Sequence, residues 1–276
     1  MPAVQKKRVK SGDVEIYYEV CAGRPGAPVL FLLHGIGGDL DAWQFVRDPL
    51  VASGFSTIAM DLRGHGYSGH PTAPSTYKKE LLLEDVLAVL EAERVEKVIL
   101  VGHSGGAVLA LEFALQNPDK LSSLVLLAGS YGPPRYLRSP AVQRVVWFFT
   151  TVGAALSPHA RGPWHSPYPK GKFHKEFELW GLARTLYHNS LRSYLLLGKT
   201  LANVDLEQRL KYITLPTLIV VGEKDGIYPV PVSKKMHDEI AHSRLEIIRN
   251  ANHVLILNNP REVVDLLISF VQKLQK

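Results

Sequence analysis

The sequence predicts an α/β protein whose mostly parallel β-sheet is flanked by helices on both sides. Short runs of β-branched residues alternate along the chain with longer amphipathic segments, and most of these runs are apolar at nearly every position. Strands covered on both faces have continuous apolar runs, and strand–helix alternation is typical of parallel sheets. Because such sheets bind ligands at the carboxyl ends of their strands, we expect the functional residues in the loops that follow these runs.

Seven strands are predicted from these runs. The first alternates between apolar and polar residues, which indicates a half-exposed strand, and the last has the weakest pattern. The predicted strands span residues 14–20, 28–33, 56–60, 97–101, 122–127, 216–221 and 245–248. Apolar residues that recur every three or four positions predict helices between these strands. The predicted helices cover residues 77–95, a stretch after Ser104 that ends before Pro118, and residues 262–274.

The alternation is interrupted between residues 132 and 204, which contain aromatic and amphipathic stretches but no strand pattern. Strands of one sheet precede and follow this segment, so we interpret it as a helical insertion, the cap. Residues 1–131 and 205–276 then form one main domain. The cap contains ten basic and two acidic residues, a charge of +8, whereas the main domain has 22 basic and 24 acidic residues. The cap alone therefore accounts for the net charge of +6.

The composition of the 276 residues excludes several classes of protein. With 46% hydrophobic residues the chain can form a large core, which excludes a disordered protein. The single cysteine, Cys21, excludes a disulfide framework and a zinc site with several cysteines. The basic balance favours an anionic partner, but without a nucleic-acid-binding module we expect no nucleic acid. The N-terminus lacks the apolar core of a secretory signal, and residues 145–160 are too few to span a membrane, so we expect a cytoplasmic protein.

The clearest chemical motif follows the fourth predicted strand. Gly102-His103-Ser104-Gly105-Gly106 is a G-x-S-x-G pattern between a strand and a helix, the setting of a nucleophile elbow. In so tight a turn only small residues fit two positions before and two positions after the nucleophile, and both positions are glycine. The serine hydroxyl then points into open space at the N-terminus of a helix. The sequence therefore predicts that Ser104 is a nucleophile.

A serine nucleophile requires a base, and the base requires an acid that holds it in the correct tautomer. Of the eleven histidines, His253 lies in a loop directly after the last predicted strand, from which it can reach the elbow. A solvated loop histidine is the alternative that spacing leaves open. Glu223 and Asp225 both follow the preceding strand. We favour Asp225 because it lies deeper in the turn, whereas Glu223 adjoins Lys224 and is expected to face solvent.

Acyl transfer at the elbow also needs backbone N–H groups that stabilise an oxyanion. The helix after Ser104 supplies the N–H of Gly105. The glycine-rich loop at residues 34–38 supplies a second donor, which we expect to be the N–H of Ile36. A phosphate-binding turn is the competing interpretation of this loop, but it lacks the G-x-G-x-x-G register and the lysine of a P-loop.

Together these motifs resemble those of the α/β-hydrolase fold family over essentially the whole chain. Besides the elbow, the matching pieces are His34-Gly35, residues 61–68, the acid turn at Asp225 and the loop at residues 253–260, all in the family's order. The resemblance implies an α/β-hydrolase fold with an eight-stranded sheet and a helical cap inserted after strand six. It also implies a Ser-His-Asp triad, with no cofactor and no metal.

Two residues depart from the family pattern. Asn252 stands where the family often has Gly, and Asn258 stands where it often has Glu. Neither belongs to the triad, so we expect them to affect loop packing. Ser at position 104, in place of Asp, argues against the haloalkane dehalogenase and epoxide hydrolase branches, which use a carboxylate nucleophile.

These residues indicate a serine hydrolase that cleaves carboxylic esters with an apolar acyl or alkyl part through an acyl-enzyme. A monoacylglycerol-type lipase, a lactonase, a carbon–carbon bond hydrolase or a perhydrolase would use the same triad, and a non-catalytic receptor would use the same fold. The sequence leaves these alternatives and the oligomeric state open. For the substrate pocket we expect His103, Tyr131, Trp147, Ile227 and Val254.

The cap allows two interpretations. Phe177, Trp180, Tyr187 and Tyr194 recur at helical spacing, so this face is expected to roof the active site and to favour a substrate with an apolar part. Arg144 beside the apolar residues 145–149 indicates a second role, a peripheral contact with an anionic membrane. We favour the first interpretation and keep the second as the alternative.

Overall fold

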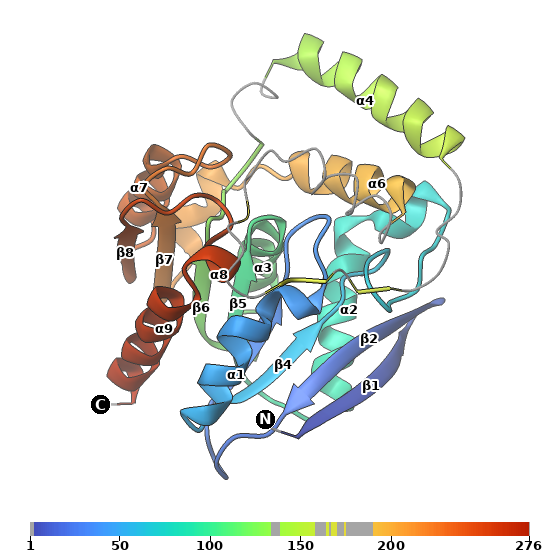
Figure 1. Cartoon of the computed structure of the whole chain (residues 1–276). Coiled ribbons are helices and arrows are strands. Elements are labelled where there is room, and N and C mark those ends of the chain that lie inside the picture. The colour runs from blue at the N-terminus through green and yellow to red at the C-terminus, as the bar shows by residue number, and fades with distance from the viewer. Residues whose placement is uncertain are drawn as a thin grey trace.

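The computed structural model describes residues 3–133, 139–157, 164–165, 167–169, 174 and 190–275. An eight-stranded sheet forms the centre of this part of the chain, with the strand order β1-β2-β4-β3-β5-β6-β7-β8 (Figure 1). β1 pairs antiparallel with β2, and β2 pairs antiparallel with β4, whereas all other neighbours run parallel. The predicted α/β fold with a mostly parallel sheet is therefore confirmed.

Seven of the strands overlap the predicted runs, and one does not. The seven are β2 (Val14–Cys21), β3 (Val29–Leu33), β4 (Ser56–Met60), β5 (Val98–His103), β6 (Leu121–Leu127), β7 (Thr217–Gly222) and β8 (Ser243–Ile248). β1 (Val4–Ser11) has no counterpart among the predicted runs. Its sequence, VQKKRVKS, is rich in cations and mostly exposed, because β1 lies at the edge of the sheet.

Helices cover the two faces of the sheet in separate groups (Figure 1). α2 (Lys79–Ala92) and α3 (Gly105–Gln116) belong to the apolar cluster on one face, and α1 (Gln44–Ala52) and α9 (Pro260–Leu274) belong to the cluster on the other. α7 (Val230–Glu239) packs against β7 and β8. Short elements complete this part of the chain. They are α8 (Leu255–Asn258) and the 3-10 turns η1 (Leu40–Trp43), η2 (Pro74–Tyr77), η3 (Pro118–Lys120) and η5 (Glu207–Tyr212).

The boundaries of two predicted helices differ from the observed ones for local reasons. The helix predicted over residues 77–95 is preceded by the separate turn η2, so α2 begins at Lys79 and ends at Ala92. The C-terminal helix begins at Pro260, two residues before the predicted start. Proline is favoured at the first helical position because the N–H that it lacks has no partner there.

Between β6 and β7 the chain forms α4 (Pro140–Leu156) and α6 (Leu191–Ala202), which pack against each other. α6 also contacts α3, and α4 forms the outermost layer of the molecule (Figure 1). The N–H of Leu206 donates to the carbonyl oxygen of Tyr131 over 2.7 Å, so the chain leaves and re-enters the main domain at one place. This fits a cap at residues 132–204, a boundary that stays a prediction.

Of the predicted aromatic face, Phe177, Trp180 and Tyr187 lie outside the described residues. No helix in the described ranges combines the length and the apolar character that crossing a bilayer requires.

Candidate active site

Ser104 lies at the turn between β5 and α3, as the G-x-S-x-G motif predicts. Its φ of 54° and ψ of −118° lie in a region that residues other than glycine rarely adopt. A Cβ atom at Gly102 would collide with the backbone of Ala107, and one at Gly106 would collide with the carbonyl oxygen of Leu33. Both glycines are therefore required by close approaches of the backbone, and the turn leaves the Ser104 side chain partly exposed.

Ser104, His253 and Asp225, which lie far apart in the sequence, form one chain of hydrogen bonds. The Ser104 hydroxyl donates to Nε2 of His253 over 2.8 Å, and Nδ1 of His253 donates to Oδ2 of Asp225 over 3.0 Å. His253 and Asp225 are both buried. The hydroxyl thus has an adjacent base, and the base is held in the tautomer that can accept a proton.

The turn after β7 fixes Asp225 in place. Its Oδ1 accepts from the backbone N–H groups of Ile227 and Tyr228 over 2.9 and 2.7 Å. The ring of Tyr228, a residue that the sequence did not indicate, lies edge-on to the ring of His253 with 5.7 Å between their centroids. Glu223, the other candidate acid, is exposed and accepts from a backbone N–H after β8. The geometry therefore favours Asp225.

His103, the residue before Ser104, contacts the loop that carries His253. Its ring is buried, and Nε2 donates to the carbonyl oxygen of His253 over 3.0 Å. Burial, reinforced by the neighbouring His253, lowers the pKa of His103 to about 3. His103 is therefore neutral at physiological pH, and its Nε2–H bonds to the backbone carbonyl oxygen of His253.

The loop after β3 lies directly beside the elbow. A Cβ on Gly105 would lie 2.7 Å from Cγ1 of Ile36, and a Cβ on Gly35 would lie 3.0 Å from Cβ of Ser104. His65 accepts a hydrogen bond from a backbone N–H of this loop over 3.0 Å, and burial holds the pKa of His65 well below its usual value. Ile36 and Gly105 are thus neighbours at the elbow, while their role as oxyanion donors stays a prediction.

The predicted pocket residues lie at different depths. Ile227 and Val254 are partly buried. Ile227 follows Asp225 by two residues, and Val254 directly follows His253. Tyr131 is buried in the apolar cluster that also contains residues of α6, and Trp147 is half-buried on α4. The Nε2–H of His103 already donates to the carbonyl oxygen of His253. Contact of these residues with a substrate stays a prediction.

Asn252 and Asn258, the two departures from the family pattern, connect the base loop to the cap. Their side-chain amides both donate to the carbonyl oxygen of His174, over 3.0 and 2.8 Å. Oδ1 of Asn258 accepts from the N–H of His174 over 2.9 Å, and the amide of Asn258 also donates to Oδ1 of Asn252. These positions therefore contribute to packing, and the segment that they pack against belongs to the cap.

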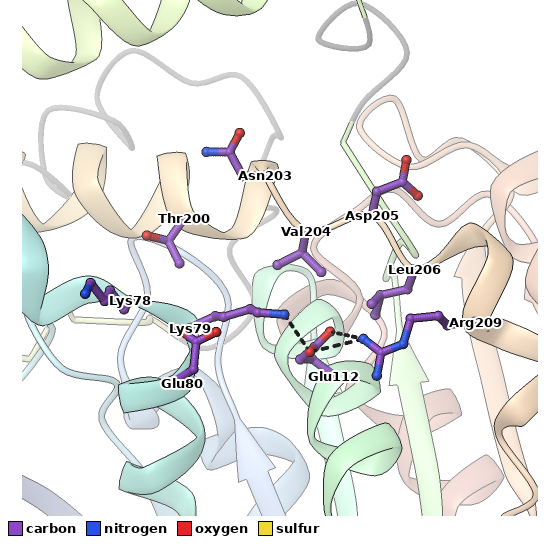
Figure 2. Close-up of a pocket in the computed structure, with 10 residues that line it drawn as sticks. All are labelled: Lys78, Lys79, Glu80, Glu112, Thr200, Asn203, Val204, Asp205, Leu206 and Arg209. Carbon is purple, nitrogen blue, oxygen red and sulfur yellow. Dashed lines mark hydrogen bonds and ion pairs between the residues drawn. The ribbon is translucent and has the colours of Figure 1, made fainter.

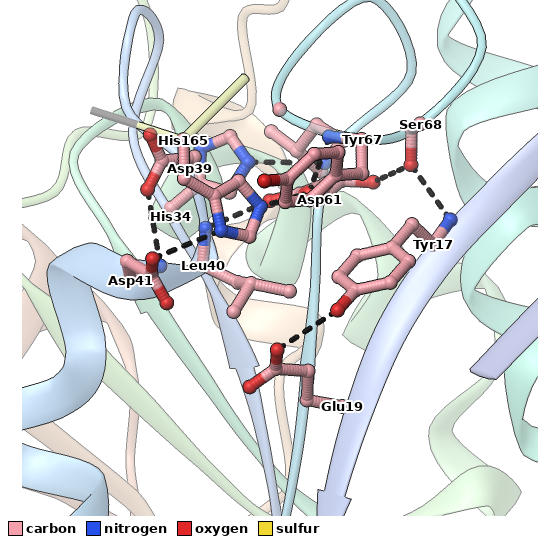
Figure 3. Close-up of polar contacts among 12 residues, drawn as sticks. Tyr17, Glu19, His34, Asp39, Leu40, Asp41, Asp61, Tyr67, Ser68 and His165 are labelled. Atoms are coloured by element: carbon pink, nitrogen blue, oxygen red, sulfur yellow. Dashed lines mark hydrogen bonds and ion pairs between the residues drawn. The ribbon is translucent and has the colours of Figure 1, made fainter. Parts of the chain in front are cut away.

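A second polar cluster joins the cap to the main domain (Figure 3). His165 donates from Nδ1 to Oδ2 of Asp41 over 2.9 Å and from Nε2 to Oδ2 of Asp61 over 2.7 Å. Asp61 is fully buried and also accepts from the N–H groups of Leu40 and Tyr67. Burial alone would lower the pKa of His165, but hydrogen bonds to the two carboxylates raise it to about 10. His165 is therefore a cation at neutral pH.

The same cluster contains a group that could hold a metal ion. Asp39, Asp41 and His165 each place one ligand atom within 4.8 Å of the others. A metal would have to displace a proton from His165, because both of its ring nitrogens donate to carboxylates. The geometry is fully explained by the ion pairs, so we describe this cluster as a latch between the cap and the main domain.

A surface pocket lies between α2, α3 and the end of the cap (Figure 2). Inside it, Lys79 and Arg209 donate to the buried carboxylate of Glu112 over 2.7 and 3.3 Å. Burial opposes ionisation of Glu112, but the hydrogen bond from Lys79 lowers its pKa below the ordinary value. Since one carboxylate is shared by both cations, we assign this pocket to the packing of α3 and not to binding of an anion.

Comparison with known proteins identifies the family. A sequence model described as alpha/beta hydrolase fold matches residues 28–260. The chain belongs to the α/β-hydrolase fold family. Among its relatives, protein ABHD8 of Bos taurus is 29% identical over 271 residues, which are 98% of this chain and 62% of the relative. The chain thus spans about three fifths of the length of the ABHD8 proteins that it matches.

Two other proteins match over nearly their whole length. The pimeloyl-[acyl-carrier protein] methyl ester esterase of Vibrio atlanticus (strain LGP32) is 30% identical over 260 residues, 89% of this chain and 95% of the relative. Among solved structures, a thermophilic esterase from Thermogutta terrifontis is similar with a TM-score of 0.78 at 22% identity, over 99% of this chain and 100% of that chain. The similarity to the Thermogutta terrifontis structure shows that the two chains share a fold.

Proposed function

We propose that this α/β-hydrolase is a carboxylic ester hydrolase with Ser104, His253 and Asp225 as its catalytic triad. The observation that carries the proposal is the unbroken chain of hydrogen bonds from the Ser104 hydroxyl to the Asp225 carboxylate. The strained backbone at Ser104 adds support, because strain of this kind is retained at sites where it serves a function. The relative from Vibrio atlanticus, named as an ester hydrolase, favours the same bond type.

The proposed reaction has two halves. Oγ of Ser104 attacks the ester carbonyl carbon while Nε2 of His253 takes the hydroxyl proton, and Asp225 stabilises the imidazolium that forms. The N–H groups of Ile36 and Gly105 stabilise the oxyanion, after which the alcohol leaves with the proton from His253. Water then attacks the acyl-enzyme with His253 again acting as base, and this step releases the acid and restores the Ser104 hydroxyl.

Apolar side chains beside the elbow support a substrate with an apolar part. A Cβ on Gly105 would lie 3.1 Å from Cδ1 of Leu201, which α6 of the cap contributes, and 2.7 Å from Cγ1 of Ile36. The first helical turn after Ser104 is therefore bordered by aliphatic groups from the cap and from the loop after β3. Such a border favours an alkyl or acyl chain over a charged group near the reacting carbon.

Hydrolysis of p-nitrophenyl butyrate and p-nitrophenyl octanoate tests this proposal. Ser104→Ala is expected to lower kcat/KM on the order of 10⁴-fold or more, and Asp225→Asn by about 10⁴-fold. The matched control is Glu223→Gln, which removes the other carboxylate of the same turn and is expected to leave the rate unchanged. Full activity of the Ser104→Ala protein would contradict the proposal, and loss of activity in Glu223→Gln with retention in Asp225→Asn would reverse the choice of acid.

A panel of substrates separates the remaining alternatives that share this triad. It contains esters of increasing acyl length, a monoacylglycerol, a lactone and a vinylogous diketone for the carbon–carbon reaction, and perhydrolysis is assayed with acetate and hydrogen peroxide. An ester hydrolase is expected to turn over the simple esters many times. A single slow acylation of Ser104, detected as an increase in protein mass without turnover, would instead indicate a receptor.

A further inference from the structure

One face of α4 carries a continuous row of exposed apolar side chains. Val145, Phe148, Phe149 and Leu156 are 57%, 63%, 67% and 80% exposed. Val142 extends the row toward the N-terminus of the helix, and Val152 lies between Phe149 and Leu156. All six recur at intervals of three or four residues apart from the adjacent Phe148 and Phe149, so they lie on one side of the helix.

The opposite side of α4 is packed on α6. Ala154 is buried, and a Cβ on Gly153 would lie 3.2 Å from Cδ1 of Leu195 on α6. Two cations of α6 also bond to α4: Lys199 donates to Oγ1 of Thr151 over 3.0 Å, and Arg192 donates to a backbone carbonyl over 2.9 Å. One face of α4 is therefore seated on α6 (Figure 1), and the exposed apolar row lies outside this contact.

Single exposed apolar residues are ordinary on protein surfaces, but a contiguous row is not. Among the described residues, eleven large apolar side chains are exposed, and six of them belong to α4. The Phe148 and Phe149 rings contact each other, with 5.5 Å between their centroids, which makes the middle of the row its bulkiest part. This concentration marks α4 as an interaction surface.

The charge of this region indicates what kind of surface the row contacts. α4 and α6 together contain Arg144, Arg192 and Lys199 and no Asp or Glu. Arg144 is exposed and lies one helical turn before Phe148, at the border of the apolar row. An apolar face bordered by a cation, in a region without acidic residues, is typical of a helix that lies in the interface of an anionic bilayer, whereas an acidic protein partner would not require so large an apolar row.

We propose that α4 docks the protein on an anionic lipid surface. The apolar row lies at the boundary between headgroups and acyl chains, Arg144 lies among the lipid phosphates, and the helix axis is parallel to the membrane. With 17 residues, α4 is about 25 Å long, enough to anchor the cap along one side. Since α4 packs on α6 and Leu201 of α6 lies beside the elbow, docking would hold the part of the cap that borders Ser104 near the lipid surface. Docking does not depend on the proposed ester hydrolysis.

Co-sedimentation of the full chain with lipid vesicles tests the proposal. At low salt the wild-type protein is expected to sediment with vesicles of phosphatidylglycerol and phosphatidylcholine, and to bind pure phosphatidylcholine more weakly. The Phe148→Ser/Phe149→Ser double variant is expected to lower the vesicle partition coefficient by at least about tenfold, because two exposed aromatic rings lose their burial in lipid. Arg144→Gln is expected to weaken binding to the anionic vesicles about fivefold and to leave binding to phosphatidylcholine unchanged.

Tyr212→Ser is the matched control, because Tyr212 is 65% exposed, as much as Phe149, but belongs to the main domain. Its binding should equal that of the wild type, and circular dichroism with urea unfolding confirms that each variant is folded. Absence of wild-type binding to anionic vesicles, or unchanged binding of the double variant, would overturn the proposal. So would a wild-type dimer in light scattering that ignores vesicles and becomes a monomer in the double variant, since the row would then join two copies of this chain.

Discussion

Replacing His165 with glutamine removes the cation that joins the cap to the main domain, while a polar side chain of similar length remains. In the wild-type protein this cation bonds to Asp41 and to the fully buried Asp61. The rise of its pKa from 6.5 to about 10 corresponds to a ceiling of about 5 kcal/mol of stabilisation. Because 38% of the Asp41 side chain is exposed and solvent screens that ion pair, we expect His165→Gln to lower the free energy of unfolding by about 2 kcal/mol.

The dependence of this loss on pH follows from the direction of the shift. A pKa that is higher in the folded state means that the latch contributes fully below the unfolded value of 6.5. Its contribution falls as the pH rises from 6.5 and is lost above a pH of about 10. The hydrogen bond from His165 lowers the pKa of Asp41 despite its burial, so this carboxylate remains ionised where the latch is strongest. The difference between variant and wild type should therefore be largest between about pH 5 and 6.5 and should vanish in strong alkali.

Urea unfolding followed by circular dichroism, repeated from pH 5 upward, measures this difference. His237→Gln is the matched control, because His237 is exposed on α7 and bonds to the neutral hydroxyl of Ser243. This control should change stability little at any pH. If His165→Gln unfolded at the wild-type urea concentration near pH 6, or if its deficit were the same at every pH, the assignment of His165 as a charged latch would be wrong.

Three further substitutions test other parts of the structure. His103→Phe keeps the ring volume but removes the bond to the base loop, so we expect kcat to fall at least about tenfold with little change in KM, measured by steady-state hydrolysis. Gly106→Ala places a Cβ against the carbonyl oxygen of Leu33 and is expected to lower the free energy of unfolding by about 3 kcal/mol, measured in urea. Asp85→Asn leaves the buried Arg63 without its ionised partner and should cost about 3–5 kcal/mol; unchanged thermal unfolding would show that solvent reaches this pair.

The strands and the elbow could be predicted because their causes are local. A strand such as β5, buried on both faces, is apolar at almost every position, and a turn as tight as that at Ser104 needs glycines two positions away on each side. β1 could not be predicted from periodicity, because an edge strand with exposed faces can carry charges at successive positions. Its place in the sheet depends on pairing with β2 and on no pattern of its own.

Residues that act across long separations could not be assigned from the sequence. His165 lies 104 residues from Asp61 and 124 residues from Asp41, and its role exists only after the cap has folded over the main domain. Asp61 belongs to a motif that the sequence showed, yet nothing local indicated which cation it would bind. Tyr228 likewise follows the predicted acid by three residues, but its contact with the ring of His253 depends on the meeting of the turns after β7 and β8.

Hydrogen bonds to His174 explain why asparagine stands at positions 252 and 258 in place of the family's residues. A glycine at position 252 has no side chain to donate, and a glutamate at position 258 could accept from the N–H of His174 but could not donate to its carbonyl oxygen. The two asparagines together satisfy both backbone groups of His174, and Asn252 adjoins the base that bonds to Ser104. A displacement of this cap segment would therefore strain the loop that positions the base. The seating of the cap segment and the alignment of the Ser104–His253–Asp225 hydrogen bonds are thus linked through His174.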